Sequence, residues 1–133
     1  LIYLWMNLKN LLRPVLLTKT LDLSFPVFNG FLPFVANPLL LLWLLALIGR
    51  LRKKQLDRRD IILVICYLAT VVMLCLHRTL GGWQFGTRYL VDPFPFCLLF
   101  FARHRFEAGP ASRGLLLAAI LFNFYGAAYM LSA

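Results

Sequence analysis

The stretch GGWQFGTRYLVDPFPF, at 81–96, holds the residues of this chain whose types and spacing could do chemistry. Arg88 and Asp92 lie four residues apart, one helical turn, and Gln84 precedes them. An arginine guanidinium is a planar, permanently charged fork that suits phosphate oxygens, and a glutamine amide can donate a further hydrogen bond. Asp92 would orient Arg88. The stretch therefore predicts a phosphate-binding site.

The same spacing also allows a structural interpretation, in which Arg88 and Asp92 form an ion pair that fixes helix packing at a membrane boundary. An ionisable residue within a membrane span favours a functional site, because a charge left unpaired in lipid is costly. Spacing alone leaves both interpretations open. The candidate binding residues are Arg88, Arg78, Gln84, Trp83 and Tyr89, with Asp92 as the orienting residue.

The composition places this candidate site in a membrane protein. Of the 133 residues, 62% are hydrophobic and 14% charged, and the mean hydropathy is +0.80. A soluble domain is far more polar. The formal net charge is +9, but the basic residues mostly lie between long apolar runs, so membrane topology explains them better than nucleic-acid binding. We expect membrane lipid, and not nucleic acid, as a partner.

Four apolar runs predict transmembrane helices, because a bilayer core of about 30 Å needs about 20 helical residues. The runs are 31–49, 61–76, 89–102 and 114–133. Asn37 followed by Pro38 predicts an N-cap and a first turn within the first run, and Asp60 is a suitable cap for the second. Pro93 and Pro95 predict a kink or an irregular start in the third.

Residues 1–17 predict an interfacial amphipathic helix or the tail of an earlier span, interrupted by Pro14. The apolar face holds Leu1, Trp5, Leu8 and Leu12, and the polar residues mostly off it are Asn7, Lys9, Asn10 and Arg13. The predicted fold is all-α: a polytopic transmembrane helical bundle of about four spans plus this N-terminal helix, forming a single membrane domain over 1–133. Because the chain starts with Leu1, we expect it to be part of a larger protein whose remaining helices are its partners.

Basic residues predict the orientation, because short loops rich in lysine and arginine stay in the cytoplasm. Residues 50–59 carry six of them and form the strongest signal in the chain. With this stretch cytoplasmic, alternation of the spans puts 77–88 at the outer face and returns the chain to the cytoplasm at 103–113. We therefore expect a multi-pass protein of the cytoplasmic membrane with the candidate site at its outer face.

The cysteines and histidines do not predict a metal site. Cys66, Cys75 and Cys97 lie within apolar runs without a C-x-x-C pair, so we interpret them as small buried hydrophobic residues. His77 and His104 fall on opposite sides of the membrane in the predicted topology and cannot share a metal ion. No metal and no cofactor is expected in this chain.

The remaining polar residues of the apolar runs and loops predict no catalytic set. Asp22 is a lone carboxylate beside turn-forming residues, which is typical of a loop. Asn123 predicts a hydrogen bond between helices, and Gly126 predicts close packing next to it. No catalytic residue is identified.

The opening stretch, followed by an apolar span, a basic turn and LLLAAILFNFYGAAYM, resembles the C-terminal portion of bacterial polytopic membrane proteins related to GT-C type glycosyltransferases. The resemblance covers about Leu80 to Met130 well and the two preceding spans loosely. The residues that match the recurring pattern are Gln84, Phe85, Gly86, Arg88, Tyr89, Asp92 and Pro95.

This resemblance implies an enzyme that takes a sugar from a polyprenyl-phosphate carrier and passes it to an acceptor at the outer face of the membrane. Arg88 and Arg78 would neutralise the phosphate that becomes the leaving group, and Trp83 and Tyr89 would stack on the sugar or lie along the prenyl chain. The family's catalytic carboxylate lies in an earlier loop. No position here matches it, and Asp22 does not take that role.

Two functions thus remain open from the sequence. The first is the C-terminal membrane portion of a glycosyltransferase, which supplies lipid-phosphate contacts but no identifiable catalytic base. The second is a non-enzymatic membrane subunit for transport or assembly, in which Arg88 and Asp92 are a structural pair.

Overall fold

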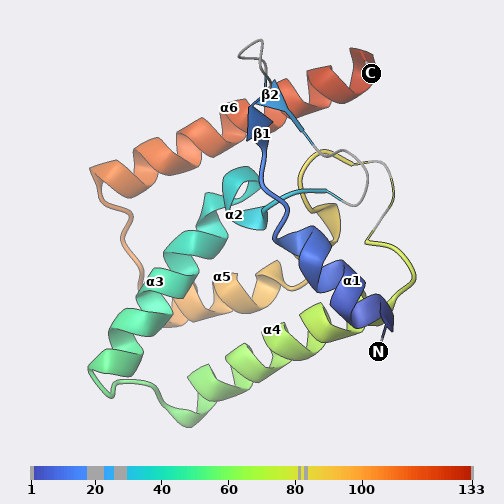
Figure 1. The fold of residues 1–133 in the computed structure, drawn as a ribbon. Helices are drawn as coiled ribbons and strands as arrows, with labels where there is room; N and C mark the ends of the chain where they lie inside the picture. Colours follow the sequence, from blue (N-terminus) through green and yellow to red (C-terminus); the bar gives the residue numbers. More distant parts are fainter. Residues whose placement is uncertain (1, 18–22, 26–29, 81, 83, 133) are drawn as a thin grey trace.

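The computed structural model describes residues 2–17, 23–25, 30–80, 82 and 84–132. The elements in chain order are α1 (Ile2–Leu11), β1 (Leu16–Leu17), β2 (Leu23–Ser24), α2 (Pro33–Ala36), α3 (Pro38–Arg52), α4 (Arg58–Leu76), the 3-10 helix η1 (Arg88–Val91), α5 (Phe94–Arg103) and α6 (Pro110–Ser132) (Figure 1). The expected all-α class is confirmed for the body of the chain. The exception is the antiparallel pair β1–β2, in which Leu17 lies opposite Leu23.

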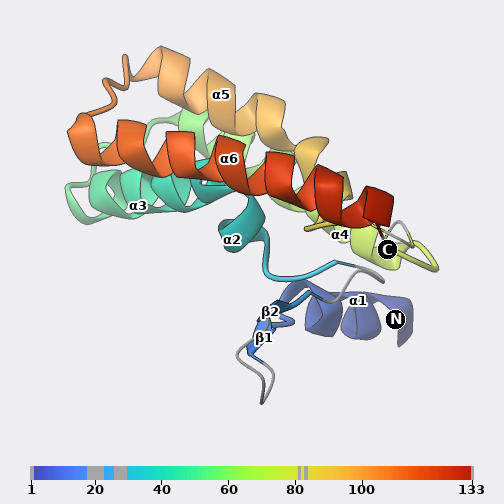
Figure 2. The ribbon, with the colours of Figure 1, turned by 90° about the horizontal axis from the view of Figure 1, so that it is seen from above.

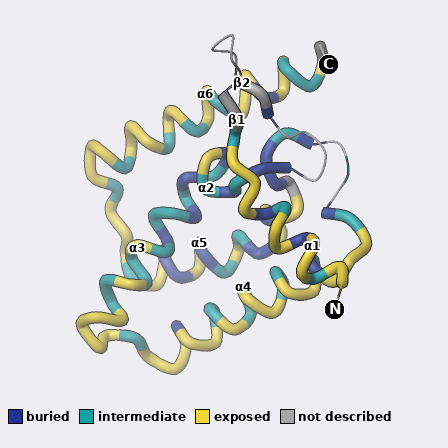
Figure 3. Tube along the Cα trace, in the orientation of Figure 1, coloured by how far each residue is buried: buried dark blue, intermediate teal, exposed yellow. Residues whose placement is uncertain are grey.

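Two helices are long and apolar enough to cross a membrane. They are α4, with 19 residues and a mean hydropathy of 2.2, and the Pro110–Leu131 part of α6, with 22 residues and a mean hydropathy of 1.7. Only 17% and 11% of their most apolar stretches are buried within the protein, whereas a core helix of a soluble protein is mostly buried. Figure 3 shows exposed residues along most of α6. Length, composition and exposure support a membrane protein, and the two helices correspond to the predicted spans 61–76 and 114–133.

The predicted span 31–49 is not confirmed as a membrane crossing, because the chain divides there into α2 and α3. Pro38 has no N–H group and favours a first helical turn, so α3 begins at this residue. Asn37 occupies the N-cap position as expected, but its side chain makes no capping hydrogen bond. With 15 residues, α3 is about 22 Å long, less than the hydrocarbon core of a bilayer.

The predicted span 89–102 also divides, into η1 and α5, and is not confirmed as a crossing. The expected irregular start is present: η1 ends at Val91, and α5 begins at Phe94 after Pro93, with Pro95 in its first turn. Its 10 residues are about 15 Å long. The prolines thus shorten the regular helix to half of what a crossing needs.

The cap of α4 differs from the expected one. Asp57, and not Asp60, is the N-cap, and the helix starts at Arg58. The Asp57 carboxylate accepts from the Asp60 N–H at 2.9 Å, and the Asp60 carboxylate accepts from the Asp57 N–H at 3.2 Å. This reciprocal capping box satisfies two backbone donors of the first turn, which explains why the helix begins three residues earlier than Asp60 would set it.

Helix α1 is present, and it buries Asn7, a polar residue, against the end of α4. Asn7 is fully buried, whereas Trp5 and Leu12 are 64% and 70% exposed. The Asn7 amide donates to the carbonyls of Cys75 and His77 at 3.0 and 2.8 Å. The last carbonyls of a helix have no partner within that helix. Asn7 supplies the missing donors at the C-terminal end of α4, and its side chain is therefore buried between α1 and α4.

The main helical core lies between α3, α4 and α5. Trp43 of α3 packs against Tyr67 of α4 with ring centroids 4.6 Å apart, and Phe100 of α5 meets Trp43 edge to face. Cys97 in this core and Cys75 near the end of α4 are fully buried, as expected for small hydrophobic residues, whereas Cys66 is only half-buried.

The two basic stretches lie on the same side of the protein. Figures 1 and 2 place the α3–α4 and α5–α6 connections at one end of the helices and the 77–88 loop at the other. An ion pair between Arg103 and Asp57 joins the two connections. This arrangement is the one that the predicted orientation requires, and the assignment of these ends to the cytoplasm and the outer face stays a prediction.

Candidate functional site

The Gln84–Thr87 segment of the predicted site is fixed by backbone contacts. The buried Thr87 hydroxyl donates to the Phe31 carbonyl at 2.6 Å. Gly86 and Gly30 both have positive φ angles, 72° and 77°, and their backbones touch so closely that a Cβ atom at Gly30 would overlap the Gly86 carbonyl. Glycine is needed for both the conformation and the approach. The loop is therefore held against the segment that leads into α2.

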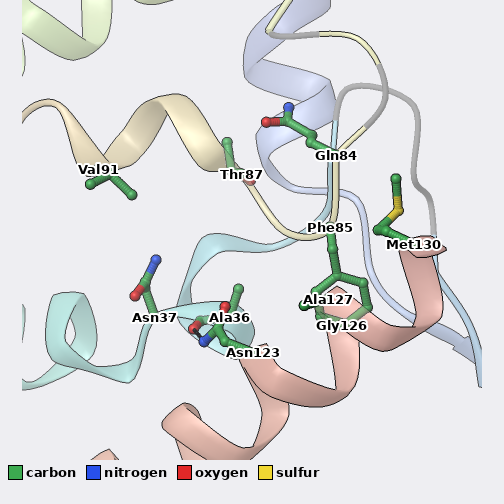
Figure 4. A pocket seen from close by; sticks show the side chains of 10 residues that line it. All are labelled: Ala36, Asn37, Gln84, Phe85, Thr87, Val91, Asn123, Gly126, Ala127 and Met130. Atoms are coloured by element: carbon green, nitrogen blue, oxygen red, sulfur yellow. Dashed lines mark hydrogen bonds between the residues drawn. The ribbon is translucent and has the colours of Figure 1, made fainter.

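Phe85 anchors the same loop to α6. Its ring lies 5.0 to 5.1 Å, between centroids, from the rings of Phe25, Phe31 and Phe122. It also rests on Gly126, where a Cβ atom would overlap the ring (Figure 4). The close packing expected at Gly126 is present, but its partner is a loop phenylalanine and not another helix.

Asn123 of α6 makes the helix-to-helix hydrogen bond that the sequence predicted. Its side-chain amide donates to the Ala36 carbonyl at the end of α2 and to the Ala119 carbonyl in its own helix, each at 2.8 Å. The first of these bonds joins residues 87 positions apart. It holds α6 beside the α2–α3 junction, so that three parts of the chain meet at one place.

A partly polar pocket of about 460 Å³ opens at this meeting point. Its walls are Ala36, Asn37, Gln84, Phe85, Thr87, Val91, Asn123, Gly126, Ala127 and Met130. Figure 4 shows the elements that supply these residues: the loop carries Gln84 and Thr87, the start of α3 carries Asn37, and α6 carries Asn123. The Asn37 side chain makes no hydrogen bond within the described part of the protein. Its amide can therefore serve a ligand with hydroxyl or carbonyl groups.

An apolar groove of about 670 Å³ adjoins this pocket between α3 and α6. Its walls are Asn37, Pro38, Leu39, Leu116, Ala119, Ile120, Asn123, Phe124 and Ala127. Asn37, Asn123 and Ala127 line both spaces. The partly polar pocket thus continues into the apolar groove. Together they suit a molecule with a polar head and an apolar tail.

Two other predicted site residues lie in a different pocket. Tyr89 and Asp92 line a space of about 340 Å³ with His77, near the end of α4. The ring Nδ1 of His77 lies 3.3 Å from the Thr79 carbonyl. Three of the predicted site residues therefore divide between two pockets, with Gln84 in the first and Tyr89 and Asp92 in the second.

Of the two arginines of the predicted site, only Arg78 has a described side chain, and it lines neither pocket. Arg78 is exposed in the loop after α4. Arg88 opens η1 directly after Thr87, and its side chain lies outside the described part of the protein, as do Trp83 and Asp22. The phosphate-binding role of Arg88 and its pairing with Asp92 therefore stay predictions.

A charged cluster that the sequence did not reveal joins the start of α4 to the end of α5. The Asp60 side chain is fully buried, and its Oδ1 atom lies 3.2 Å from Arg103 Nε and 2.9 Å from His104 Nε2. Arg103 also binds the Asp57 carboxylate. The hydrogen bond from the Asp60 N–H, together with the Arg103 guanidinium, lowers the pKa of Asp57 below its ordinary value.

Only the Asp57–Asp60 part of this cluster could be recognised from the sequence. An acidic residue three positions after Asp57 predicts a capping box, but no pattern links it to Arg103 and His104, which lie 43 and 44 positions from Asp60. Among the described residues, no group of three histidine, cysteine or carboxylate side chains could hold a metal ion. The cluster joins the start of α4 to the end of α5 through side-chain contacts.

The comparisons with known proteins add no relative. No family model matches the chain, and neither a curated protein nor a solved structure matches it. The resemblance carried by the 81–96 stretch thus rests on its own residues.

Proposed function

We propose that this chain is the membrane part of a glycosyltransferase that uses a polyprenyl-phosphate-linked sugar at the outer face of the cytoplasmic membrane. The observation that carries the proposal is the junction of the amide-lined pocket with the apolar α3–α6 groove. A lipid-linked sugar has the same division, with hydroxyl groups at one end and hydrocarbon at the other. Asn37 and Asn123 lie at the boundary between the two.

In this proposal the sugar occupies the pocket and the prenyl chain follows the groove. Asn37 offers a donor and an acceptor to the sugar hydroxyls, whereas the Gln84 amide donates to the Leu80 carbonyl and shapes the pocket wall. The phosphate lies between sugar and chain, and Arg88, the next residue after Thr87 of the pocket wall, neutralises it as the leaving group. The acceptor and the base that activates it belong to other parts of the enzyme.

Binding of a polyprenyl-phosphate sugar to paired variants tests the proposal. Ile120→Trp places a large ring in the groove, whereas Leu121→Trp is its matched control, because Leu121 is exposed beside it and lines neither space. We expect Ile120→Trp to weaken binding and Leu121→Trp to leave it unchanged. Equal effects of the two variants would refute the assignment of the groove to the prenyl chain.

The polar pocket is tested by Asn37→Ala, with Asn10→Ala of α1 as the control that lines neither space. Since the Asn37 side chain makes no capping bond, its removal should not unfold α3. Loss of one hydrogen bond predicts about fivefold weaker binding of the sugar-linked lipid. Polyprenyl phosphate without sugar should bind Asn37→Ala as it binds the wild type. An equal loss with both lipids would show that the pocket does not hold the sugar, and no loss with either would favour the non-enzymatic alternative.

A further inference from the structure

A second groove, between α4 and α5, has two arginines at one end and hydrocarbon beyond them. It has a volume of about 510 Å³ and is lined by Arg59, Ile62, Leu63, Leu99, Ala102 and Arg103. Each helix contributes three residues at i, i+3 and i+4, which is the spacing of one helix face. The groove is thus built from two regular faces and lies at the end of the protein opposite the amide-lined pocket.

The charge at this end is not neutralised by the acidic residues nearby. Residues 50–59 contain six basic side chains and one carboxylate, that of Asp57. This carboxylate and that of Asp60 bind Arg103, so Arg103 is fixed at the groove with its charge largely balanced. Arg59, in contrast, makes no ion pair with a described residue. The groove therefore offers, next to an apolar channel, a guanidinium that has no ion-pair partner among the described residues.

The apolar part of the groove has no protein cover. Ile62 and Leu99, one on each side, are 57% and 55% exposed. In a helix pair that lies in a membrane, these side chains contact lipid tails, and an arginine at the helix end reaches the headgroup layer. A positive head region and a hydrocarbon channel complement the phosphate and the acyl chain of a phospholipid.

We propose that this groove is a binding site for an anionic phospholipid, with the phosphate on Arg59 and one acyl chain along Ile62 and Leu99. The net positive charge of the surrounding stretch favours an anionic headgroup over a zwitterionic one. The site is separate from that of the lipid-linked sugar and does not depend on the proposed enzyme activity. It gives the α4–α5 pair, already fixed by the Asp60 cluster, a specific lipid partner at the predicted cytoplasmic side.

Native mass spectrometry of the full chain in detergent tests this site, with phosphatidylglycerol and phosphatidylcholine of identical acyl chains as probes. We expect the wild type to retain phosphatidylglycerol in preference to phosphatidylcholine. Arg59→Gln should lower retention of phosphatidylglycerol about fivefold. Arg58→Gln removes the same charge from a neighbouring residue that does not line the groove, and it should retain phosphatidylglycerol as the wild type does. Equal losses in the two variants would mean attraction to a charged surface and would overturn the site.

The apolar half has its own matched pair. Leu98 and Leu99 are exposed to nearly the same extent, 53% and 55%, but only Leu99 lines the groove. Leu99→Trp should fill the channel and reduce retention of phosphatidylglycerol, whereas Leu98→Trp should not. Circular dichroism of both variants verifies that the helices remain. Equal retention by the two variants, or equal retention of the two lipids by the wild type, would refute the proposal.

Discussion

Replacing Asp60 by asparagine should destabilise the protein more than any other single charge change at the α4–α5 end. The Asp60 side chain is fully buried, and its carboxylate receives Arg103, His104 and the Asp57 N–H. Asparagine has the same shape, but it removes the negative charge and presents an NH₂ group in place of one acceptor. At least one of the three donors then loses its partner.

The magnitude follows from how far the partners can reach water. Removing one member of a buried ion pair costs about 3–5 kcal/mol. The side chains of Arg103 and His104 are 30% and 16% exposed, so both can recover part of their hydration. We therefore expect a loss near the lower limit, about 3 kcal/mol in the free energy of unfolding.

Unfolding of the purified chain by sodium dodecyl sulfate, followed by circular dichroism, measures this loss. Glu107→Gln is the matched control, because Glu107 is an exposed carboxylate on the same side that makes no ion pair with a described residue. It should change the free energy of unfolding by no more than about 0.5 kcal/mol. If Asp60→Asn is as stable as Glu107→Gln, the buried cluster does not hold the two helix ends together.

Two further predictions concern the loop and the cap. Gly30→Ala should destabilise the protein by about 1–3 kcal/mol more than Gly82→Ala in chemical unfolding, because both residues have positive φ but only Gly30 touches Gly86; equal losses would exclude the backbone contact. The hydrogen bond from the Asp60 N–H lowers the pKa of Asp57 from its ordinary 3.8. The stability that this carboxylate contributes is therefore present above pH 3.8, and it is lost as the pH falls through the lower pKa of the folded protein. Asp57→Asn should flatten unfolding curves measured across this acidic range, and an unchanged pH dependence would contradict the cap assignment.

The features that could be predicted from sequence are those whose cause is local. Pro38 ends one helix and begins another because a proline lacks the N–H group, and Pro93 interrupts the third apolar run for the same reason. The apolar runs that form α4 and α6 are recognisable from length and composition alone. The same locality explains why two of the four predicted spans are not confirmed, since a run of apolar residues counts as one segment even where a proline divides it into shorter helices.

The features that could not be predicted depend on partners far along the chain. The amphipathic pattern of residues 1–17 gives no partner for Asn7, which is buried because its amide binds the carbonyls of Cys75 and His77, about seventy positions away. Asn123 could be recognised as an interhelical donor, whereas its acceptor at Ala36 could not. Periodicity identifies which face of a helix is apolar, but it does not identify a helix end that needs a donor.

The candidate site has both local and long-range features. The charges of the 81–96 stretch predict a phosphate site, yet every described side chain that lines the pocket is uncharged. Amides and a hydroxyl suit a neutral sugar, and they leave a phosphate without a counter-charge. A lipid-linked sugar phosphate therefore needs a cation that the described lining does not supply. In the proposed function Arg88, which follows Thr87 of the pocket wall in the chain, would supply this cation. Under the proposed function, the neutral pocket would hold the sugar and the charged motif the phosphate of one ligand.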